Sequence, residues 1–281
     1  MLNVIEVVKK TSEFFASKGV ESPRLNAELV VGHALGLARM SLYLNFERPV
    51  SETELAAIRE LVRRRGRREP LQYVIGFTEF AGLRLKTDRR ALIPRPETEL
   101  LVETVGARCA TPPGRVLDMG TGCGAIALAL ASMFPEARVT AADSSAEALS
   151  LAAENARTTG LAERVTLVES RWFERLPAGA TYDVVVSNPP YLSPAEVAAA
   201  DPEVRDHEPM ASLVSGADGF EDIGKIIAAT PSALARGGML ALETGVAHHA
   251  LAAASALRAG FTRTESLRDL TGRDRFFLAW R

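Results

Sequence analysis

The chain has 281 residues, of which 47% are hydrophobic and 24% are charged, and its formal net charge is −2. This charge balance argues against a protein whose whole surface binds nucleic acid, and the two cysteines, Cys109 and Cys123, fit neither a disulfide framework nor a metal-binding spacing. Since the sequence shows no signal-peptide pattern and no long apolar run, we expect a cytoplasmic globular protein with no metal and no membrane contact.

The first 70 residues predict a small helical bundle. Helical spacing relates Val4, Val7, Val8, Phe14 and Phe15 in one segment and Leu25, Leu29, Val30 and His33 in the next. Ser51 and Glu54 predict a capping box at the start of a helix that runs from Leu55 to Arg68. His33 lies on the apolar side of its helix, so we expect it to pack in the core rather than to bind a ligand.

The last of these helices ends in five arginines around Gly66, over residues 63–68. Positive charge is favourable at a helix C-terminus, where the backbone carbonyls point outward. The alternative is a docking surface for an anionic partner. The sequence leaves both interpretations open.

Residues 71–92 predict a β-hairpin that links the bundle to a larger domain. Its strands are expected at Tyr73–Phe77 and Leu83–Leu85, with Ala81-Gly82 in the turn. The segment Ile93–Glu99 then leads into a helix that runs through Cys109, because prolines and acidic residues favour a helix N-terminus. A rigid lid over a ligand is the alternative role for Ile93–Glu99.

A strand, a glycine turn and a helix follow at Arg115–Met119, Gly120–Gly124 and Ala125–Phe134. This succession opens the nucleotide-binding α/β fold, in which glycines let the backbone approach a ligand closely. The spacing Asp-x-Gly-x-Gly-x-Gly differs from the Gly-x-Gly-x-x-Gly of dinucleotide dehydrogenases. It suits S-adenosylmethionine, which has no pyrophosphate to bind.

The next strands add further candidates for contact with this cofactor. Asp143 ends the strand that begins at Val139, where an acidic residue can reach ribose hydroxyls, and Ser144 is expected to cap the following helix. After a third strand, Val165–Glu169, Trp172-Phe173 offers a flat surface for adenine. A tryptophan packed in the core is the alternative.

We expect the chemistry at Asn188-Pro189-Pro190-Tyr191, which follows the apolar strand Val184–Val186. Prolines cannot continue a central strand, so a stiff turn begins here. The Asn188 side-chain oxygen and the Pro189 carbonyl can each accept one N–H of a planar amide, and the Tyr191 ring can stack on it. Fixing the nitrogen in this way would orient it towards a methyl donor without a strong general base.

Later segments predict a helix at Ile223–Ile227, a strand at Met239–Glu243, a helix at Leu251–Ala259 and a final strand at Arg275–Trp280. They would complete a doubly wound α/β sheet with ligands at the carboxyl ends of its strands. His207, Glu208, His248 and His249 show no metal-ligand spacing, so we expect surface or helix-capping positions for them.

Together, the motifs resemble the HemK family of protein-(glutamine-N5) methyltransferases. The resemblance rests on Ile93–Glu99, Leu117–Leu128, Trp172-Phe173, Val186–Tyr191, and Glu208-Pro209 followed by Gly219, and it extends over essentially the whole chain. It implies a seven-stranded, mostly parallel Rossmann-like sheet at residues 93–281, behind a substrate-docking helical domain at 1–70 and the hairpin linker at 71–92. It also implies a monomer that uses S-adenosylmethionine to methylate the glutamine of the Gly-Gly-Gln motif in class I peptide chain release factors.

The resemblance also assigns expected roles to individual residues. Asn188, Pro189 and Tyr191 would be catalytic, and Asn188 to Tyr191, with Pro190, would bind the substrate glutamine. The expected cofactor-binding residues are Asp118, Gly120, Thr121, Gly122, Cys123, Gly124, Asp143, Trp172 and Asn188. Arg171 stands where the family usually has an acidic residue, which leaves the partner of the adenine amino group unassigned.

Two other functions fit parts of the pattern. An adenine-N6 methyltransferase of DNA or RNA would use a similar tetrapeptide on a flipped-out base, but the acidic pI and the lack of a large basic domain disfavour it. A binding module without catalysis is disfavoured by the intact glycine turn and the intact residues Asn188–Tyr191.

Overall fold

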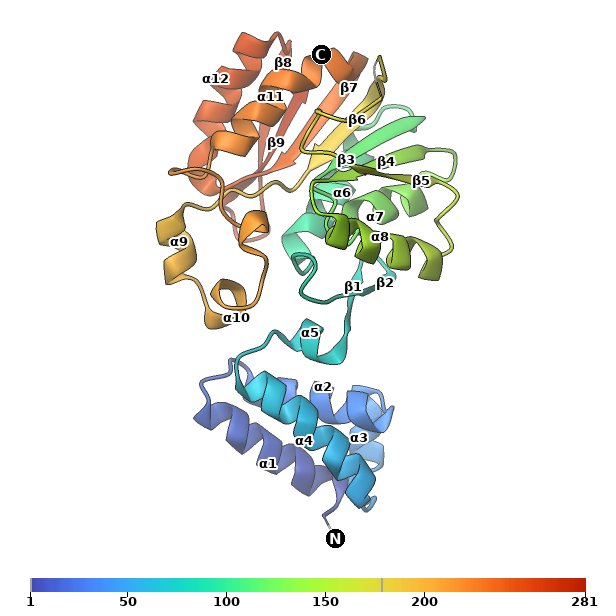
Figure 1. Ribbon diagram of the computed structural model, residues 1–281, viewed down its shortest axis with the longest axis vertical. Coiled ribbons are helices and arrows are strands. Elements are labelled where there is room, and N and C mark those ends of the chain that lie inside the picture. The colour runs from blue at the N-terminus through green and yellow to red at the C-terminus, as the bar shows by residue number, and fades with distance from the viewer. Residues whose placement is uncertain (1, 178) are drawn as a thin grey trace. The chain divides into compact units, whose positions relative to one another are not determined.

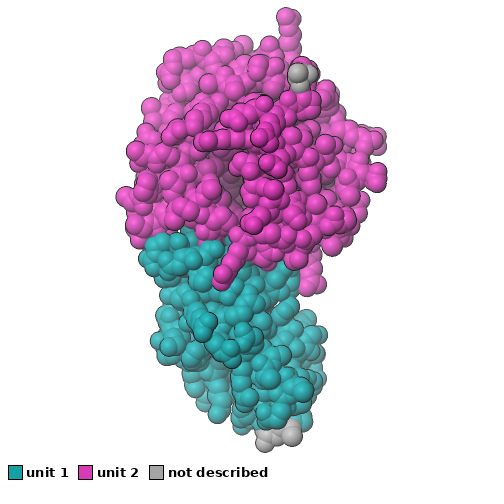
Figure 2. All heavy atoms as spheres, in the orientation of Figure 1, with its two compact units in different colours: residues 1–77, 201–207 teal, residues 78–200, 208–281 magenta. Residues whose placement is uncertain are grey.

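The computed structural model describes residues 2–177 and 179–281, which form two compact units (Figure 2). Residues 1–77 and 201–207 belong to the N-terminal unit, and residues 78–200 and 208–281 belong to the C-terminal unit. No helix in the described part of the chain is long and apolar enough to cross a membrane.

The N-terminal unit is helical, as the apolar spacing predicts (Figure 1). Its helices are α1 (Val4–Ser17), α2 (Pro23–Leu35), α3 (Arg39–Leu44), α4 (Glu52–Gly66), α5 (Leu71–Ile75) and α10 (Pro202–Arg205). The predicted capping box is confirmed, because the Ser51 hydroxyl accepts from the Glu54 N–H and the Glu54 carboxylate accepts from the Ser51 N–H. Phe15, Val30 and Ile58 contribute to a buried apolar core.

The predicted apolar face of α2 is wrong at two positions. This helix buries Ala27, Val30 and Val31, and that face leaves Leu25 and His33 on the exposed side. The His33 ring lies 6.2 Å from the Phe77 ring, at the surface rather than in the core. Helical spacing alone did not define which of two adjacent stripes faces inward.

The arginine run has a structural role that neither interpretation anticipated. Arg65 is buried, donates to Asn26 Oδ1 at 2.8 Å and lies 2.9 Å from Glu203. Arg68 donates to both Glu203 carboxylate oxygens, at 2.7 and 2.6 Å, and Arg64 pairs with Glu69 at 2.7 Å. Three of the arginines therefore stabilise the N-terminal unit from within, and Glu203 holds the 201–207 segment to α4.

The hairpin is confirmed, but its first strand starts later than predicted. The strands are β1 (Phe77–Phe80) and β2 (Leu83–Lys86), joined by Ala81 and Gly82, both with positive φ. Residues 73–75, which the sequence assigned to a strand, belong to helix α5. Arg64 donates to the carbonyls of Tyr73 and Val74, so α4 satisfies backbone groups at the end of this short helix.

The C-terminal unit is built on a seven-stranded, mostly parallel sheet, which confirms the predicted fold class. Its strands are β3 (Arg115–Met119), β4 (Arg138–Asp143), β5 (Val165–Glu169), β6 (Tyr182–Ser187), β7 (Leu234–Glu243), β8 (Arg263–Arg268) and β9 (Asp274–Trp280). Their order is β5-β4-β3-β6-β7-β9-β8, and β9 runs antiparallel to both of its neighbours, β7 and β8. The order reverses between β3 and β6, which is where ligands bind in doubly wound sheets.

Helices cover both faces of this sheet (Figure 1). One layer consists of α6 (Pro96–Arg108), α7 (Ala125–Met133) and α8 (Ala146–Thr158), and the other of α11 (Glu221–Ala233) and α12 (His249–Ala259). Side chains alternate between the layers, so Val184 and Val186 of β6 join the first core and Val185 joins the second. The short helices α9 (Pro194–Ala199), η1 (Met210–Ser212) and η2 (Val246–His248) lie in loops.

Three residues expected at the surface or at helix caps are buried, although one of them, His248, is the N-cap residue of α12. Glu208, His248 and His249 are 6 to 7% exposed. Glu208 pairs with Arg95 and accepts from the Ile93 N–H at 3.3 Å, and burial raises the pKa of its carboxyl. The described residues contain no cluster of three His, Cys, Asp or Glu side chains that could bind a metal ion.

Candidate functional site

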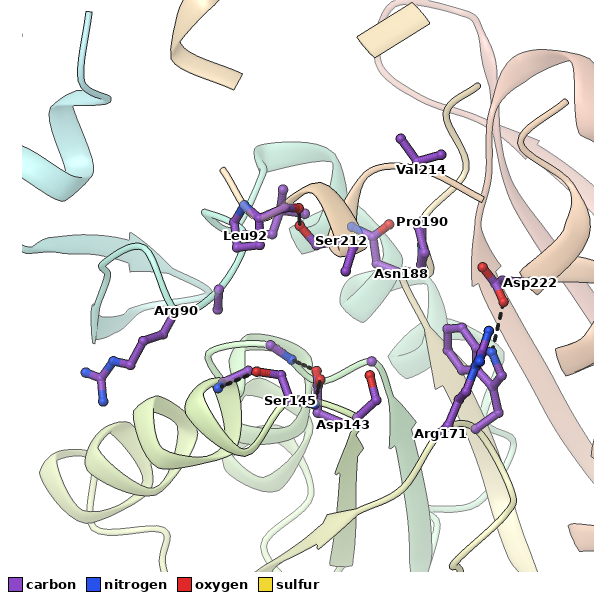
Figure 3. Close-up of a pocket in the computed structure, with 18 of the residues that line it drawn as sticks. Arg90, Leu92, Asp143, Ser145, Arg171, Asn188, Pro190, Ser212, Val214 and Asp222 are labelled. Atoms are coloured by element: carbon purple, nitrogen blue, oxygen red, sulfur yellow. Dashed lines mark hydrogen bonds between the residues drawn. The ribbon is translucent and has the colours of Figure 1, made fainter. Parts of the chain in front are cut away.

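A cavity of about 530 Å³ opens at the carboxyl ends of the parallel strands. This volume is in the range of small-molecule and cofactor sites. The lining residues are Arg90, Ala91, Leu92, Gly120, Gly122, Asp143, Ser144, Ser145, Ala148, Ser170, Arg171, Trp172, Asn188, Pro190, Pro209, Ala211, Ser212, Val214 and Asp222. Figure 3 shows Asn188, Pro190 and Ser212 on one side of the cavity, across from Asp143 and Ser145.

The sheet brings these residues together because parallel strands end at one edge. Gly120 follows β3, Asp143 ends β4, Ser170 follows β5 and Asn188 follows β6. Met119 is in register with Ala142 on one side and with Ser187 on the other, so the three loops start level with one another. Residues separated by almost 70 positions in the sequence therefore line one cavity.

The glycine turn brings bare backbone to the cavity wall. Gly120 and Gly122 line the cavity with φ of +69° and +55°, a region that side chains disfavour. A Cβ at Gly120 would lie 3.7 Å from the Trp172 ring, so a side chain there would occupy the space in front of the indole. The turn is fixed to β4 because the Gly120 and Thr121 N–H groups both donate to the Ala142 carbonyl.

The other predicted residues of this turn lie behind it and do not line the cavity. Asp118 is fully buried and accepts from the Thr121 hydroxyl at 2.6 Å and from the Ala127 N–H at 3.1 Å. Its Oδ1 has no hydrogen-bond partner among the described residues, and burial raises the pKa of its carboxyl to about 7. Cys123 is buried as well, and burial raises the pKa of its thiol to about 12.

Asp143 occupies the predicted place at the end of β4. Its carboxylate accepts from the Gly122 N–H and the Ser145 N–H, each at 2.9 Å, and burial raises its pKa. The helix cap differs from the prediction: Ser145, and not Ser144, is the N-cap of α8, and its hydroxyl accepts from the Ala148 N–H. Asp143 thus joins the glycine turn to the start of α8.

Trp172 lines the cavity and has an anchored ring. Its indole N–H donates to Asp222 Oδ1 at 3.0 Å (Figure 3). The Ser215 hydroxyl donates to Asp222 Oδ2 at 2.9 Å. Asp222 was missed from the sequence, where an acid in the first turn of a helix signals only helix stabilisation. Phe173 does not line the cavity and packs against the core shared with α11 and α12.

The bend after β6 keeps two acceptor atoms unpaired. The Asn188 side-chain nitrogen donates to the Thr98 hydroxyl at 3.1 Å, so its amide is held by nitrogen rather than by oxygen. Within residues 2–177 and 179–281, no hydrogen bond reaches Asn188 Oδ1 or the Pro189 carbonyl. Asn188 and Pro190 line the cavity.

Pro189 and Tyr191 lie outside the cavity lining. Pro189 is buried, and the Tyr191 hydroxyl donates to Glu243 at 3.1 Å. Burial, with the nearby Glu243 charge, raises the pKa of Tyr191. The residues Ile93–Glu99 do not line the cavity either, and Thr98 of this segment accepts a hydrogen bond from the Asn188 side chain. The lid interpretation of the segment stays a prediction.

Comparisons with known proteins agree with this architecture. The PrmC N-terminal domain profile matches residues 6–76, and the methyltransferase small domain profile matches residues 96–201. A release factor glutamine methyltransferase of Chlorobaculum tepidum is 45% identical over 86% of this chain and 85% of its own length. One of Geobacter sulfurreducens is 43% identical over 96% and 94%. A methyltransferase structure from Pyrococcus furiosus matches 70% of this chain and 88% of its own, with a TM-score of 0.53 and 20% identity, and supports the fold alone.

Proposed function

The chain belongs to the release factor glutamine methyltransferase family, and from this premise we propose that it methylates the side-chain nitrogen (N5) of a glutamine in a peptide chain release factor. The substrate would be the glutamine of the Gly-Gly-Gln motif of class I release factors, and the methyl donor S-adenosylmethionine. The observation that carries the proposal is the pair of unpaired oxygens, Asn188 Oδ1 and the Pro189 carbonyl, at the bend beside the cavity.

The cavity fits this cofactor in size and in chemistry. Its volume of about 530 Å³ suits a nucleoside-sized ligand. Trp172 would stack on the adenine, Asp143 would accept from the ribose hydroxyls, and the backbone at Gly120 and Gly122 would pass close to the ligand. When bound, S-adenosylmethionine would supply an electrophilic methyl group on a positively charged sulfur.

Asp118, Thr121, Cys123 and Gly124 do not line the cavity. They would influence the cofactor indirectly, by holding the glycine turn in its shape. Asp118 holds this turn in place, because its Oδ2 accepts from the Thr121 hydroxyl at 2.6 Å and from the Ala127 N–H at 3.1 Å.

The residues of the bend would make a weak nucleophile competent by position. An amide nitrogen is a poor nucleophile because its lone pair is delocalised into the carbonyl. Asn188 Oδ1 and the Pro189 carbonyl would each accept one N–H of the glutamine amide, so that the nitrogen faces the methyl group and its developing positive charge is stabilised. Pro190 would contact the glutamine side chain, and the amide would lose one proton after methylation. Orientation of the reactants can lower the activation free energy of such a reaction by about 7–11 kcal/mol.

We propose further that the N-terminal unit docks the release factor. An apolar groove in that unit runs over α1 and α4, is lined by Val7, Phe14 and Val62, and has the cationic Lys10 and Arg59 at its sides. Phe14→Ala should raise KM for the intact release factor and leave KM for a Gly-Gly-Gln peptide unchanged. An equal effect on both substrates, or no effect, would contradict docking at this groove.

The activity can be tested with labelled S-adenosylmethionine and three acceptors: a class I release factor, the same factor with its Gly-Gly-Gln glutamine changed to alanine, and duplex DNA. We expect label only in the unaltered factor. Label in DNA alone would support the adenine-N6 alternative, and binding of the factor without any transfer would support a non-catalytic module.

A further inference from the structure

A chain of buried hydrogen bonds lies directly behind Asn188. The Asn188 side-chain nitrogen donates to the Thr98 hydroxyl at 3.1 Å, and that hydroxyl donates to Glu243 Oε2 at 2.7 Å. The Tyr191 hydroxyl donates to the other oxygen, Glu243 Oε1, at 3.1 Å. Thr98 lies in the first turn of α6 and Glu243 ends β7, so two elements distant in sequence meet behind the bend.

The burial of this chain makes its hydrogen bonds directional. Thr98 and Glu243 are 3% and 1% exposed, so no solvent can replace a missing partner. A carboxylate only accepts hydrogen bonds, whereas a hydroxyl donates one hydrogen and accepts through its lone pairs. Since Thr98 donates its hydrogen to Glu243, it can only accept from Asn188. An Asn188 oxygen turned towards Thr98 would face another oxygen with no hydrogen between them, which is costly in a buried site.

We propose that Thr98 and Glu243 are positioning residues that fix the Asn188 amide with its nitrogen inward and its oxygen available to the substrate. The inference rests on the proposed function and names the residues that determine which end of the asparagine meets the glutamine. A flipped amide would present N–H donors to the N–H donors of the substrate. Glu243 imposes the orientation through Thr98 without touching any reactant.

Two hydroxyl donors and a cation surround the Glu243 carboxyl. Arg275 lies over the Tyr191 ring, with 5.7 Å between its guanidinium carbon and the ring centroid, and its Nη1 lies 3.4 Å from the Tyr191 hydroxyl. Burial raises the pKa of Glu243, and the two hydroxyl donors and Arg275 oppose that rise. In Glu243→Gln, the glutamine side-chain nitrogen could donate to the Thr98 hydroxyl. The Thr98 hydroxyl could then donate to the Asn188 side-chain oxygen, which would favour the flipped amide.

The kinetic test compares Thr98→Val, Thr98→Ser and Glu243→Gln in the full-length enzyme. At saturating S-adenosylmethionine, we expect Thr98→Val and Glu243→Gln to lower kcat for the release factor by about 10- to 100-fold. Thr98→Ser, which keeps the hydroxyl, should restore kcat to within about threefold of wild type. The Kd for S-adenosylmethionine should stay within about threefold in all three, because none of these side chains lines the cavity.

A matched control accounts for the general cost of removing a buried hydroxyl. Thr230 is fully buried and donates to the Ile226 carbonyl within α11. Thr230→Val should therefore lose stability comparable to Thr98→Val and keep the wild-type kcat. If kcat of Thr230→Val fell as far as kcat of Thr98→Val, the effect of Thr98 would be one of stability alone, and the proposal would be overturned.

A second measurement reports the orientation of the amide without any substrate. The chain has five asparagines, so the side-chain signals of ¹⁵N-asparagine-labelled enzyme can be assigned by substitution. The Asn188 side-chain hydrogens should exchange slowly in wild type and Thr98→Ser, and at least about tenfold faster in Thr98→Val. If wild type fails to methylate release factors, the proposed function fails while this exchange difference still tests the orientation. Unchanged exchange together with unchanged kcat in Thr98→Val would overturn the inference.

Discussion

Replacing Glu203 by glutamine should lower the local stability of the N-terminal unit, and the contacts of Glu203 allow the size of this loss to be estimated. The Glu203 carboxylate accepts from Arg68 at 2.7 and 2.6 Å and lies 2.9 Å from Arg65, whose side chain is only 6% exposed. Glu203→Gln keeps the shape but removes the charge and turns an N–H towards an arginine. Charge-assisted hydrogen bonds contribute about 1.5–3 kcal/mol each, and glutamine keeps one acceptor, so we expect a loss of about 2 kcal/mol in local stability.

Hydrogen exchange of the backbone amides in α4 and residues 201–207 measures this loss directly. A loss of about 2 kcal/mol corresponds to exchange about 30-fold faster. Glu60→Gln is the matched control, because Glu60 pairs with Arg63 on the same helix but both side chains are more than half exposed. Exposed pairs contribute little, so the control should exchange within about twofold of wild type. Equal effects of Glu203→Gln and Glu60→Gln would refute the reasoning.

The same contacts predict a pH dependence. Burial opposes ionisation of Glu203, but the hydrogen bonds from Arg68 and Arg65 lower its pKa below the ordinary value. A carboxyl whose pKa is lower in the folded than in the unfolded state stabilises the fold fully above its unfolded pKa of about 4.3. This stabilisation is lost as the pH falls through the pKa of the folded state. The stability difference between wild type and Glu203→Gln should therefore be full at pH 7 and shrink below about pH 4.

Three further predictions concern the cavity and the residues around it. Trp172→Ala should raise the Kd for S-adenosylmethionine about 5- to 150-fold by removing a stacking surface, and an unchanged Kd in calorimetry would contradict the adenine assignment. Gly219→Ala should lower the melting temperature by several degrees, since φ is +80° and a Cβ would lie 2.3 Å from the Tyr191 carbonyl oxygen; an unchanged melting curve would show that the loop yields. At pH 8 iodoacetamide should leave Cys123 unlabelled in the folded protein and react with the half-buried Cys109, and rapid labelling of Cys123 would contradict its burial and a pKa of about 12.

Much of the sheet could be predicted because its strands are short apolar runs that end at glycines or prolines. Arg115–Met119 was predicted with its observed bounds, since glycines follow it, and β6 ends at Ser187 because Pro189 and Pro190 cannot continue it. The edge strand β8 was missed because five of its six residues are polar and it pairs only with β9. Residues 73–75 of helix α5 were assigned to a strand because the contact that stabilises the helix comes from another helix, where the Arg64 side chain donates to the Tyr73 and Val74 carbonyls.

The part of the candidate site that lies at strand ends could be predicted from the sequence. Residues at the end of a strand or directly after it, such as Asp143, Gly120 and Asn188, were identified from local motifs, and the sheet places them at one cavity. The partners that hold these residues were not. Thr98 is 90 positions from Asn188 and 145 from Glu243, so only the folded chain shows that they form one network.

The most direct test of the central claim is the single-turnover rate of methyl transfer to a class I release factor by Asn188→Ala. With S-adenosylmethionine bound at saturation, the loss of the Oδ1 acceptor should lower this rate by at least about 100-fold and leave the fold intact. A rate close to that of wild type would contradict the claim that this oxygen holds the glutamine amide.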